Sequence, residues 1–368
     1  MIINSTNIGS RLSGIGRSSL SLSLNLLENW DHPFRLYINS SALVHFKDAK
    51  HTERIHVSGG PISPDFGFKG HLKRLIWTNK LSLMNHKDLV FNTSQMEGSI
   101  HHKRQIITVY DLIPLLQQSS HRRQYYYFKY VLPRVLKNSL RVITSSRHTK
   151  ELIMERFNVP DEKIRVIHCG VSPVFSANAP VHEKEDYIFY AGRFSPTKNI
   201  EGIVRAFEML SADGKIDLRL KLTGTEKELG FDIGEISKRT REKIDFLGCV
   251  SEERLSELYR KASLFVFPSF YEGFGLPPLE AMASGCPVLT SAVSSLPEVC
   301  GDAAYYVDPK NVVDIADGMK RVLTDEPLRK EMMTKGLERS RLFSWERSSR
   351  EHIKVFEEVF ESHKGGNS

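Results

Sequence analysis

Short apolar runs alternate with longer amphipathic segments along this chain, and the alternation occurs in both halves of its 368 residues. In the first half, strand-like runs are expected at 35–38, 88–91, 106–109 and 142–144, and 1–4 is expected to form an edge strand. Helical periodicity is found at 18–29, 125–137 and 146–157. Strands that alternate with helices predict a parallel sheet covered by helices.

The alternation pauses over residues 172–186, which contain two prolines and no clear period, and which we interpret as an interdomain linker. Strands are then predicted at 187–191, 217–223, 244–247, 264–268, 287–290 and 304–307. Helices are predicted at 200–210, 251–262, 279–284, 313–324, 328–341 and 346–362. The second half therefore predicts a second doubly wound sheet.

Two such domains place a crevice between them. Ligands of doubly wound sheets bind beyond the carboxyl ends of the strands. We therefore expect both domains to contribute to one site in an interdomain cleft.

The charge is divided unevenly between the two halves. Residues 1–175 carry 24 Lys and Arg against 12 Asp and Glu, whereas 176–368 carry 27 against 32. A basic half suits nucleic acid, an anionic membrane surface or a phosphorylated substrate, and it is also compatible with an ordinary solvated surface. The hydrophobic content of 40% is that of a globular protein and excludes a disordered or collagen-like chain.

The four cysteines form no Cys-x-x-Cys pair, and no 18-residue apolar window is present. The first residues lack the basic and apolar regions of a signal peptide. We expect a cytoplasmic protein with reduced thiols. Contact with a membrane would then be peripheral, on its inner face.

The segment 264–280, LFVFPSFYEGFGLPPLE, combines a buried strand, an irregular loop and a helix that opens on two prolines. Glu272 lies on the loop and Glu280 in the first turn of the helix. Glycines let the main chain approach a ligand, and the free N–H groups of a helix start bind anions. Two carboxylates beside such a site can hold the hydroxyl groups of a sugar or ribose. For Glu280, an interaction with the helix dipole is the structural alternative.

A second segment, 189–198, reads FYAGRFSPTK. A predicted strand runs into Gly192, and Arg193 and Lys198 follow. A guanidinium and an ammonium at a strand end suit a diphosphate. Two solvated loop cations are the alternative.

Together these segments resemble the retaining, GT-B-type glycosyltransferases of family 4, most closely the bacterial mannosyltransferases of O-antigen and exopolysaccharide synthesis. The Glu–seven residues–Glu motif corresponds to Glu272 and Glu280, and the Gly-Arg…Lys motif to Gly192, Arg193 and Lys198. Further matching segments lie at 246–255, 285–309 and 343–359, and looser ones at 13–26, 107–116 and 142–153.

The resemblance implies a role for each matching residue. Arg193 and Lys198 would neutralise the diphosphate leaving group, Glu280 would hold the ribose, and Glu272 would contact the donor sugar. Main-chain groups of Phe274, Gly275 and Leu276 would contact the sugar and phosphate, and those near Val250 would contact the base. A glycine-rich loop would face the donor phosphate, and it contains Gly14, Gly16 and Arg17. The implied domains are an acceptor-binding domain over 1–175, a nucleotide-sugar domain over 183–345, and a helix over 346–362 that returns to the first domain.

One position departs from the family pattern. Many relatives have a His before the Asp that matches Asp111, whereas this chain has Tyr110. A phenol donates a hydrogen bond but does not act as an imidazole near pH 7. Tyr110 and Asp111 remain candidate catalytic residues. A turn or helix-capping role is an equal alternative for Asp111.

The resemblance implies transfer of a sugar, by our guess mannose from GDP-mannose, to a hydroxyl of a glycan or lipid-linked glycan. We expect no cofactor and no essential metal, since the chain contains no Asp-x-Asp motif. A sugar-nucleotide epimerase or hydrolase on the same fold, or a non-catalytic nucleotide-sugar-binding subunit, is the alternative.

The aromatic and basic stretch 122–130 matches no nucleic-acid-binding module, so we expect no nucleic acid partner. The surplus positive charge of the first domain predicts contact with anionic lipid or a pyrophosphate-linked acceptor.

Overall fold

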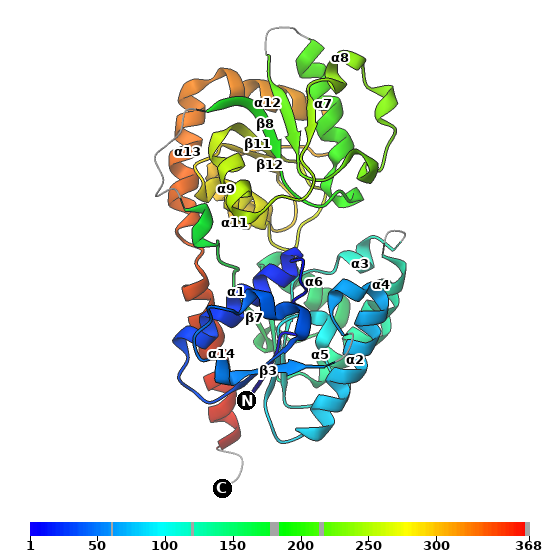
Figure 1. The fold of residues 1–368 in the computed structure, drawn as a ribbon, viewed down its shortest axis with the longest axis vertical. Helices are drawn as coiled ribbons and strands as arrows, with labels where there is room; N and C mark the ends of the chain where they lie inside the picture. Colours follow the sequence, from blue (N-terminus) through cyan, green and yellow to red (C-terminus); the bar gives the residue numbers. More distant parts are fainter. Residues whose placement is uncertain (60–61, 119–120, 177–183, 213–216, 365–368) are drawn as a thin grey trace. The chain divides into compact units, whose positions relative to one another are not determined.

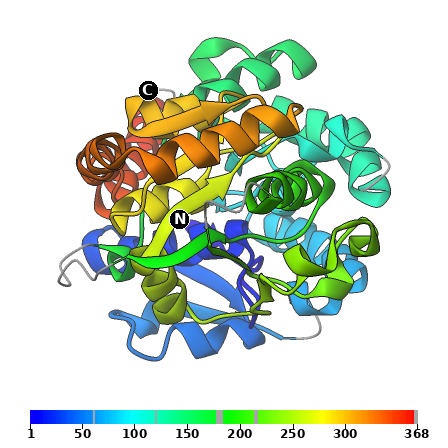
Figure 2. The same cartoon turned by 90° about the horizontal axis from the view of Figure 1, so that it is seen from above.

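The structure is a computed structural model that describes residues 1–59, 62–118, 121–176, 184–212 and 217–364 (Figures 1 and 2). The chain forms two compact units. Unit 1 comprises Met1–Gly170 and Ser344–Ser368, and unit 2 comprises Val171–Phe343. The chain thus leaves unit 1 after Gly170 and returns to it at Ser344, immediately before the last helix.

The described residues of unit 1 form a seven-stranded parallel sheet with the order β3-β2-β1-β4-β5-β6-β7. Its strands are β1 (Ile2–Asn4), β2 (Arg35–Asn39), β3 (Ile55–Ser58), β4 (Val90–Asn92), β5 (Gln105–Val109), β6 (Arg141–Thr144) and β7 (Ile164–Val166). The prediction that the first residues form an edge strand is wrong, because β1 pairs with both β2 and β4. Its apolar side chains Ile2 and Ile3 point to opposite faces and are both fully buried, as a central strand requires.

Helices cover this sheet, and sequence periodicity did not detect all of them. They are α1 (Gly14–Asn29), α2 (Gly67–Met84), α3 (Ile113–Leu116), α4 (Arg122–Tyr126), α5 (Leu132–Asn138), α6 (Arg147–Phe157) and α14 (Trp345–Lys364). The helix predicted over 125–137 is present and contains the π-helical turn η5 (Tyr127–Val131) between α4 and α5.

Different helices pack against the two faces of the unit 1 sheet. On one face, Leu81 of α2 packs against Ile2 and Val90. On the other, Phe91 of β4 contacts Phe356 of α14, with 4.9 Å between the ring centroids. Neighbouring residues of a strand point to opposite faces of the sheet. Val90 therefore faces the layer that contains α2, and Phe91 faces the layer that contains α14.

Unit 2 contains a six-stranded parallel sheet with the order β10-β9-β8-β11-β12-β13. The strands are β8 (Glu185–Tyr190), β9 (Arg219–Leu222), β10 (Ile244–Phe246), β11 (Ala262–Phe267), β12 (Val288–Ser291) and β13 (Ala304–Val307). The helices are α7 (Ile200–Ala212), α8 (Lys238–Arg241), α9 (Glu252–Lys261), α10 (Leu276–Ala283), α11 (Leu296–Cys300), α12 (Val312–Thr324) and α13 (Glu326–Ser340). All six predicted strands are present, so both halves are doubly wound α/β units as predicted.

The predicted linker 172–186 is packed against unit 2 near its start. Phe175 is fully buried in unit 2, where its ring lies edge-on to Tyr259 at 5.9 Å. The Phe175 carbonyl accepts a hydrogen bond from the Ser284 hydroxyl. The other end of the segment begins β8, and 177–183 lie outside the described residues. Periodicity missed this packing because a single aromatic residue provides it.

Within the described ranges, no helix combines the length and the apolar character needed to cross a bilayer.

Candidate functional site

The switch point of the unit 2 sheet lies between β8 and β11. From β8 the order runs through β9 to β10 on one side, and from β11 through β12 to β13 on the other. The loops that leave neighbouring strands diverge at such a point and leave room for a ligand. Arg193 and Lys198 follow β8, and Glu272 follows β11. The three predicted catalytic residues of this unit therefore lie on the two strand ends that flank the switch point.

Lys198 and Glu272 are in direct contact. The Lys198 Nζ donates to Glu272 Oε1 at 2.5 Å, and the two side chains are 18% and 8% exposed. The ammonium also lies 5.2 Å from the centroid of the Phe267 ring. Sequence spacing predicted both residues in the site, but their ion pair is visible only in the structure. It places one positive and one negative group side by side with little access to water.

The turn that carries Arg193 depends on a glycine. Gly192 has φ +151°, and a Cβ there would lie 2.8 Å from the Tyr190 hydroxyl. The Gly192 N–H donates to Thr223 Oγ1 at 2.9 Å, which ties this turn to the end of β9. The Tyr190 hydroxyl donates to the Arg193 carbonyl at 3.3 Å. Burial, and secondarily the Glu272 carboxylate, raise the pKa of Tyr190 well above its usual value, so this donor stays protonated.

Asn199 fixes the loop after Lys198, a role that no sequence pattern predicted. Its backbone is left-handed with φ +56°, a conformation that Asn tolerates better than most residues. Its Nδ2 donates to the carbonyls of Pro268 at 3.2 Å and Pro309 at 2.6 Å. Its Oδ1 accepts from the Gly202 N–H in the first turn of α7. One buried amide thus connects the β8 loop with the loops after β11 and β13.

Two serines from the β12 loop hold the loop of Glu272. The Glu272 N–H donates to Ser294 Oγ at 2.9 Å. The Ser295 hydroxyl lies 3.0 Å from the Glu272 carbonyl and 2.7 Å from the Phe274 carbonyl. Gly275 has φ +117° and ends this loop at the start of α10, whose first residue is Leu276. The predicted main-chain positions 274–276 therefore form the turn into α10.

Glu280 lies inside α10 rather than at its exposed start. It is 2% exposed and its Oε2 accepts from the Tyr259 hydroxyl of α9 at 3.3 Å. Buried carboxylates need polar partners, and a hydroxyl from a neighbouring helix is one. Tyr259 was not singled out from the sequence, because it reads as an apolar position of α9.

The remaining predicted residues of this unit flank the same end of the sheet. Arg193 is exposed. Hydrogen bonds from Thr225 lower the pKa of Glu228, and the charge of Arg193 acts in the same direction. Val250 follows β10 and precedes Ser251, the N-cap of α9. The positions predicted to contact the diphosphate and the base thus follow different strands of one sheet edge.

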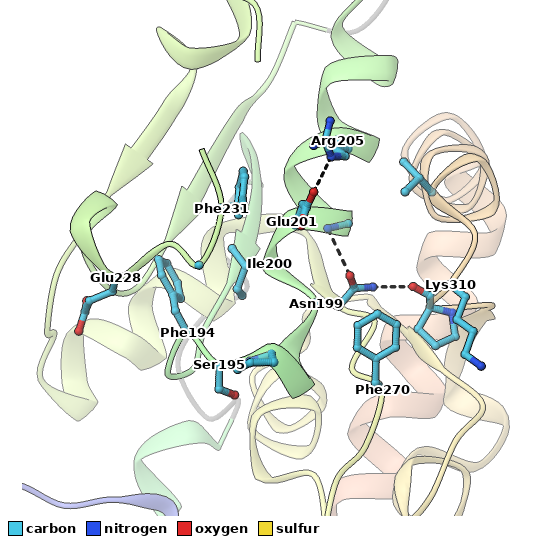
Figure 3. Close-up of a pocket in the computed structure, with 15 residues that line it drawn as sticks. Phe194, Ser195, Asn199, Ile200, Glu201, Arg205, Glu228, Phe231, Phe270 and Lys310 are labelled. Atoms are coloured by element: carbon cyan, nitrogen blue, oxygen red, sulfur yellow. Dashed lines mark hydrogen bonds and ion pairs between the residues drawn. The ribbon is translucent and has the colours of Figure 1, made fainter. Parts of the chain in front are cut away.

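A cavity of about 530 Å³ opens beside this site (Figure 3). Three phenylalanines line it, namely Phe194, Phe231 and Phe270. Glu201 on its wall forms an ion pair with Arg205 at 2.9 Å. Among its described lining residues none is a predicted donor-binding residue. The cavity therefore adjoins the Lys198 loop without containing the Lys198–Glu272 pair.

In unit 1 the predicted glycine-rich loop is instead the first turn of a helix. Gly14, Gly16 and Arg17 lie in α1, which begins at Gly14. The Ser13 side chain accepts from the Gly16 N–H at 3.1 Å and acts as the N-cap. The prediction of a loop over these residues is wrong because the serine cap starts the helix four residues before the apolar periodicity does.

Tyr110 and Asp111 directly follow β5. Tyr110 is buried, and burial raises the pKa of its phenol, with the nearby Cys169 acting in the same direction and Ser19 in the opposite one. Tyr110 is therefore a neutral side chain close to α1. The Asp111 Oδ1 accepts from the Ile113 N–H at 2.9 Å, which is the turn contact that the sequence left open as an alternative.

Beside these residues lies a buried ion pair that the sequence did not predict. Arg74 Nε of α2 donates to Glu97 Oε1 at 2.7 Å, and the two side chains are 7% and 0% exposed. The Ser94 hydroxyl donates to the other oxygen of Glu97. The pair joins α2 to the segment after β4, next to the switch point of the unit 1 sheet between β1 and β4. Within the described part of both units, no three His, Cys, Asp or Glu side chains are grouped as metal ligands would be.

Comparisons with known proteins identify the family of the chain. Residues 173–339 match the family model of the group 1 glycosyl transferases, and residues 12–175 match that of glycosyltransferase family 4. An O-antigen chain mannosyltransferase B of Escherichia coli is 31% identical over 301 residues, which cover 78% of this chain and 77% of that protein. The O-antigen chain mannosyltransferase RfbU of Salmonella typhimurium is 31% identical over 63% of this chain and 68% of its own.

Solved structures share the architecture at lower identity. Sucrose-phosphate synthase from Thermosynechococcus elongatus has a TM-score of 0.77 at 20% identity, over 98% of this chain and 99% of its own. WaaG, a glycosyltransferase involved in lipopolysaccharide biosynthesis, has a TM-score of 0.73 at 13% identity, over 96% and 99%. Anabaena HepE in complex with UDP and glucose has a TM-score of 0.71 at 14% identity, over 97% and 98%. The two doubly wound units and these matches establish that the chain belongs to the family 4, group 1 glycosyltransferases and has the GT-B fold.

Proposed function

We propose that this glycosyltransferase moves a sugar from a nucleotide diphosphate donor to a hydroxyl of a glycan or lipid-linked glycan, with retention of the anomeric configuration. The observation that carries the proposal is the Lys198–Glu272 pair at the switch point of unit 2, with Arg193 on the same loop as Lys198. A diphosphate leaving group needs positive charge, and a sugar needs a hydrogen-bond acceptor for its hydroxyl groups. This pair offers both within 2.5 Å of each other.

The chemistry divides among the residues as follows. Arg193 and Lys198 stabilise the charge that develops on the departing diphosphate. Glu272 accepts hydrogen bonds from the donor sugar, and Glu280 accepts them from the ribose. The main chain of the turn into α10 faces the sugar and the phosphate. The main chain near Val250 faces the base. The acceptor hydroxyl attacks on the face from which the diphosphate leaves, and the leaving phosphate takes its proton, so no protein base is needed.

For the acceptor, the candidate residues are those of unit 1. Asp111 is partly exposed beyond β5, and we assign its carboxylate to orient the acceptor hydroxyl. Tyr110 stays neutral and supports this strand end without taking up a proton. Gly14, Gly16 and Arg17 lie in the first turn of α1, and the positive end of the helix dipole there suits an anionic group.

Mannose is the proposed sugar and GDP the proposed nucleotide. The names of the two relatives from Escherichia coli and Salmonella typhimurium support mannose, since both are mannosyltransferases of O-antigen chains. Synthesis of a cell-surface polysaccharide is the matching biological role. We further propose that no metal is required, because the two cations of the β8 loop supply the charge that a divalent ion supplies elsewhere.

Product analysis tests this proposal. Incubation with GDP-mannose, a glycan acceptor and EDTA should yield a glycoside whose one-bond C1–H1 coupling in NMR shows the same anomeric configuration as the donor. Consumption of GDP-mannose to the same extent without any glycoside would favour an epimerase or hydrolase. Loss of the product in EDTA would overturn the proposed metal independence.

Replacing Glu280 with Gln is expected to raise the KM for the donor roughly 10- to 100-fold with little change in kcat. A hydrogen bond to a charged group contributes about 1.5–3 kcal/mol, and the ribose does not react. Steady-state kinetics with varied donor measure the effect. Tyr259→Phe is the matched control, because it removes the hydroxyl on Glu280 but keeps the carboxylate, and its KM should stay within about threefold of wild type. A tenfold fall in kcat at unchanged KM in Glu280→Gln would contradict the ribose assignment.

A further inference from the structure

The exposed face of α2 differs in charge from the rest of unit 1. Residues 66–87 contain no Asp or Glu. Four lysines of this stretch are exposed, namely Lys69, Lys73, Lys80 and Lys87. None of the four forms an ion pair with another described residue, whereas Lys50 and Lys150 of the same unit each pair with a carboxylate, at 2.6 and 2.7 Å. Lys69, Lys73 and Lys80 of α2, and Lys87 just beyond it, are therefore available to a negatively charged surface.

The same face carries aliphatic side chains that the fold leaves uncovered. Leu72 is 50% exposed, Ile76 63%, Leu83 65% and Met84 72%. At about 100° per residue, Leu72, Ile76 and Leu83 fall on one narrow line along the helix, and Lys69, Lys73 and Lys80 fall on the line beside it. An apolar line next to a basic line is the pattern of a helix that lies in a membrane interface.

The rotation of α2 is fixed, so these side chains cannot turn inward. Leu81 packs against the sheet residues Ile2 and Val90. The Thr78 hydroxyl accepts from the Asn4 side chain at 3.2 Å. Arg74 is held by Glu97. These contacts all lie on the side of the helix opposite Leu72, Ile76 and Leu83.

A second segment extends this face. His71 of α2 contacts Tyr127 edge-on, with 5.8 Å between ring centroids, which places η5 next to α2. In that segment Tyr126 and Tyr130 are 48% and 55% exposed and stack on each other at 6.4 Å. Lys129 lies 5.4 Å from the Tyr130 ring. Exposed tyrosines with basic neighbours are typical of the headgroup level of a bilayer.

We propose that α2 and the adjoining Tyr126–Tyr130 segment form a docking surface for an anionic lipid bilayer. The lysines would contact lipid phosphates, and Leu72, Ile76 and Leu83 would enter the apolar boundary. A second copy of the chain is a poorer occupant, because a two-fold contact would bring the same lysines against each other. The proposal does not depend on the donor chemistry, since binding to lipid is measured without any sugar transfer.

Vesicle co-sedimentation of the full chain tests the proposal. We expect binding to phosphatidylcholine vesicles with 30% phosphatidylglycerol to be at least about 100-fold stronger than to phosphatidylcholine alone. Replacing Lys69, Lys73 and Lys80 with Gln should weaken that binding roughly 100-fold, at about fivefold for each lysine near an anionic surface. Replacing Leu72, Ile76 and Leu83 with Ser should weaken it at least about 10-fold at unchanged net charge.

The matched control replaces Lys47, Lys103 and Lys137 with Gln, since these lysines of unit 1 are also exposed but lie outside α2. This variant should bind within about threefold of wild type. The proposal is overturned if the control loses as much binding as the α2 variant, or if both vesicle types bind alike. It is also overturned if the serine variant binds vesicles as strongly as wild type does. Light scattering that shows a dimer of wild type and a monomer of this variant would not change that conclusion.

Discussion

Replacing Glu272 with Gln is expected to lower kcat/KM for sugar transfer by about 10³-fold. Glutamine keeps the shape of the side chain but removes the charge that holds Lys198 at 2.5 Å and accepts from the sugar. Groups that act on charge developing in the transition state contribute about 10²–10³ in rate each, and this substitution disturbs the sugar contact and the cation together. Transfer of labelled sugar at varied donor concentration measures the loss.

The fold of this variant should be retained, which makes the result interpretable. The contacts of Glu272 with Ser294 and Ser295 use its main chain and are not affected. Glu201→Gln is the control, because that carboxylate is 49% exposed on the wall of the neighbouring cavity. We expect it to transfer sugar within about twofold of wild type. A Glu272→Gln enzyme with more than about a tenth of wild-type activity would remove Glu272 from the proposed chemistry.

Replacing Lys198 with Met is expected to lower kcat/KM by about 10²-fold, and the same change at Arg193 by about 10-fold. Lys198 is the less exposed of the two cations and is already held in position, whereas Arg193 is exposed and its interaction with phosphate is screened by water. Charge-assisted hydrogen bonds to phosphate are stronger when the donor is preorganised and shielded from solvent. Steady-state kinetics of the two single variants separate the contributions.

Stability must be separated from catalysis for Lys198→Met. Loss of the ammonium leaves the nearly buried Glu272 carboxylate without its cation, which we expect to cost up to about 3 kcal/mol of stability. The double variant Lys198→Met, Glu272→Gln removes both charges, so its melting temperature should recover while its activity stays low. Lys310→Met removes an exposed cation nearby and should be neutral. Recovery of activity together with stability in the double variant would mean that the pair is structural.

The sequence predicted the architecture well where strands are buried on both faces. The inner strands of unit 2 have apolar runs, as in β11, where the last four side chains are fully buried. In β9 apolar and charged residues alternate instead, and only its two leucines are buried. β3 and β7 were missed because their side chains are partly exposed or they span only three residues. α2 was missed because aliphatic residues lie on its exposed side as well as its buried one, which removes the amphipathic signal.

For the site, the sequence predicted residue types but not their contacts. Two motifs identified residues that lie at the strand ends flanking the switch point. They are the spacing of Glu272 and Glu280 and the segment from Arg193 to Lys198. The sequence could not predict that Lys198 pairs with Glu272, because the two residues are 74 positions apart. Asn199 and Ser294 were missed because they act through hydrogen bonds between loops, which leave no periodic pattern.

Calorimetric titration with GDP, UDP and ADP, with EDTA present, tests most directly whether unit 2 binds a nucleoside diphosphate through Lys198. We predict that one of the three, by our proposal GDP, binds wild type, and that the Lys198→Met, Glu272→Gln variant binds it about 100-fold more weakly although it is folded. Equal affinity in wild type and the double variant, or no binding of any of the three to wild type, would contradict the account.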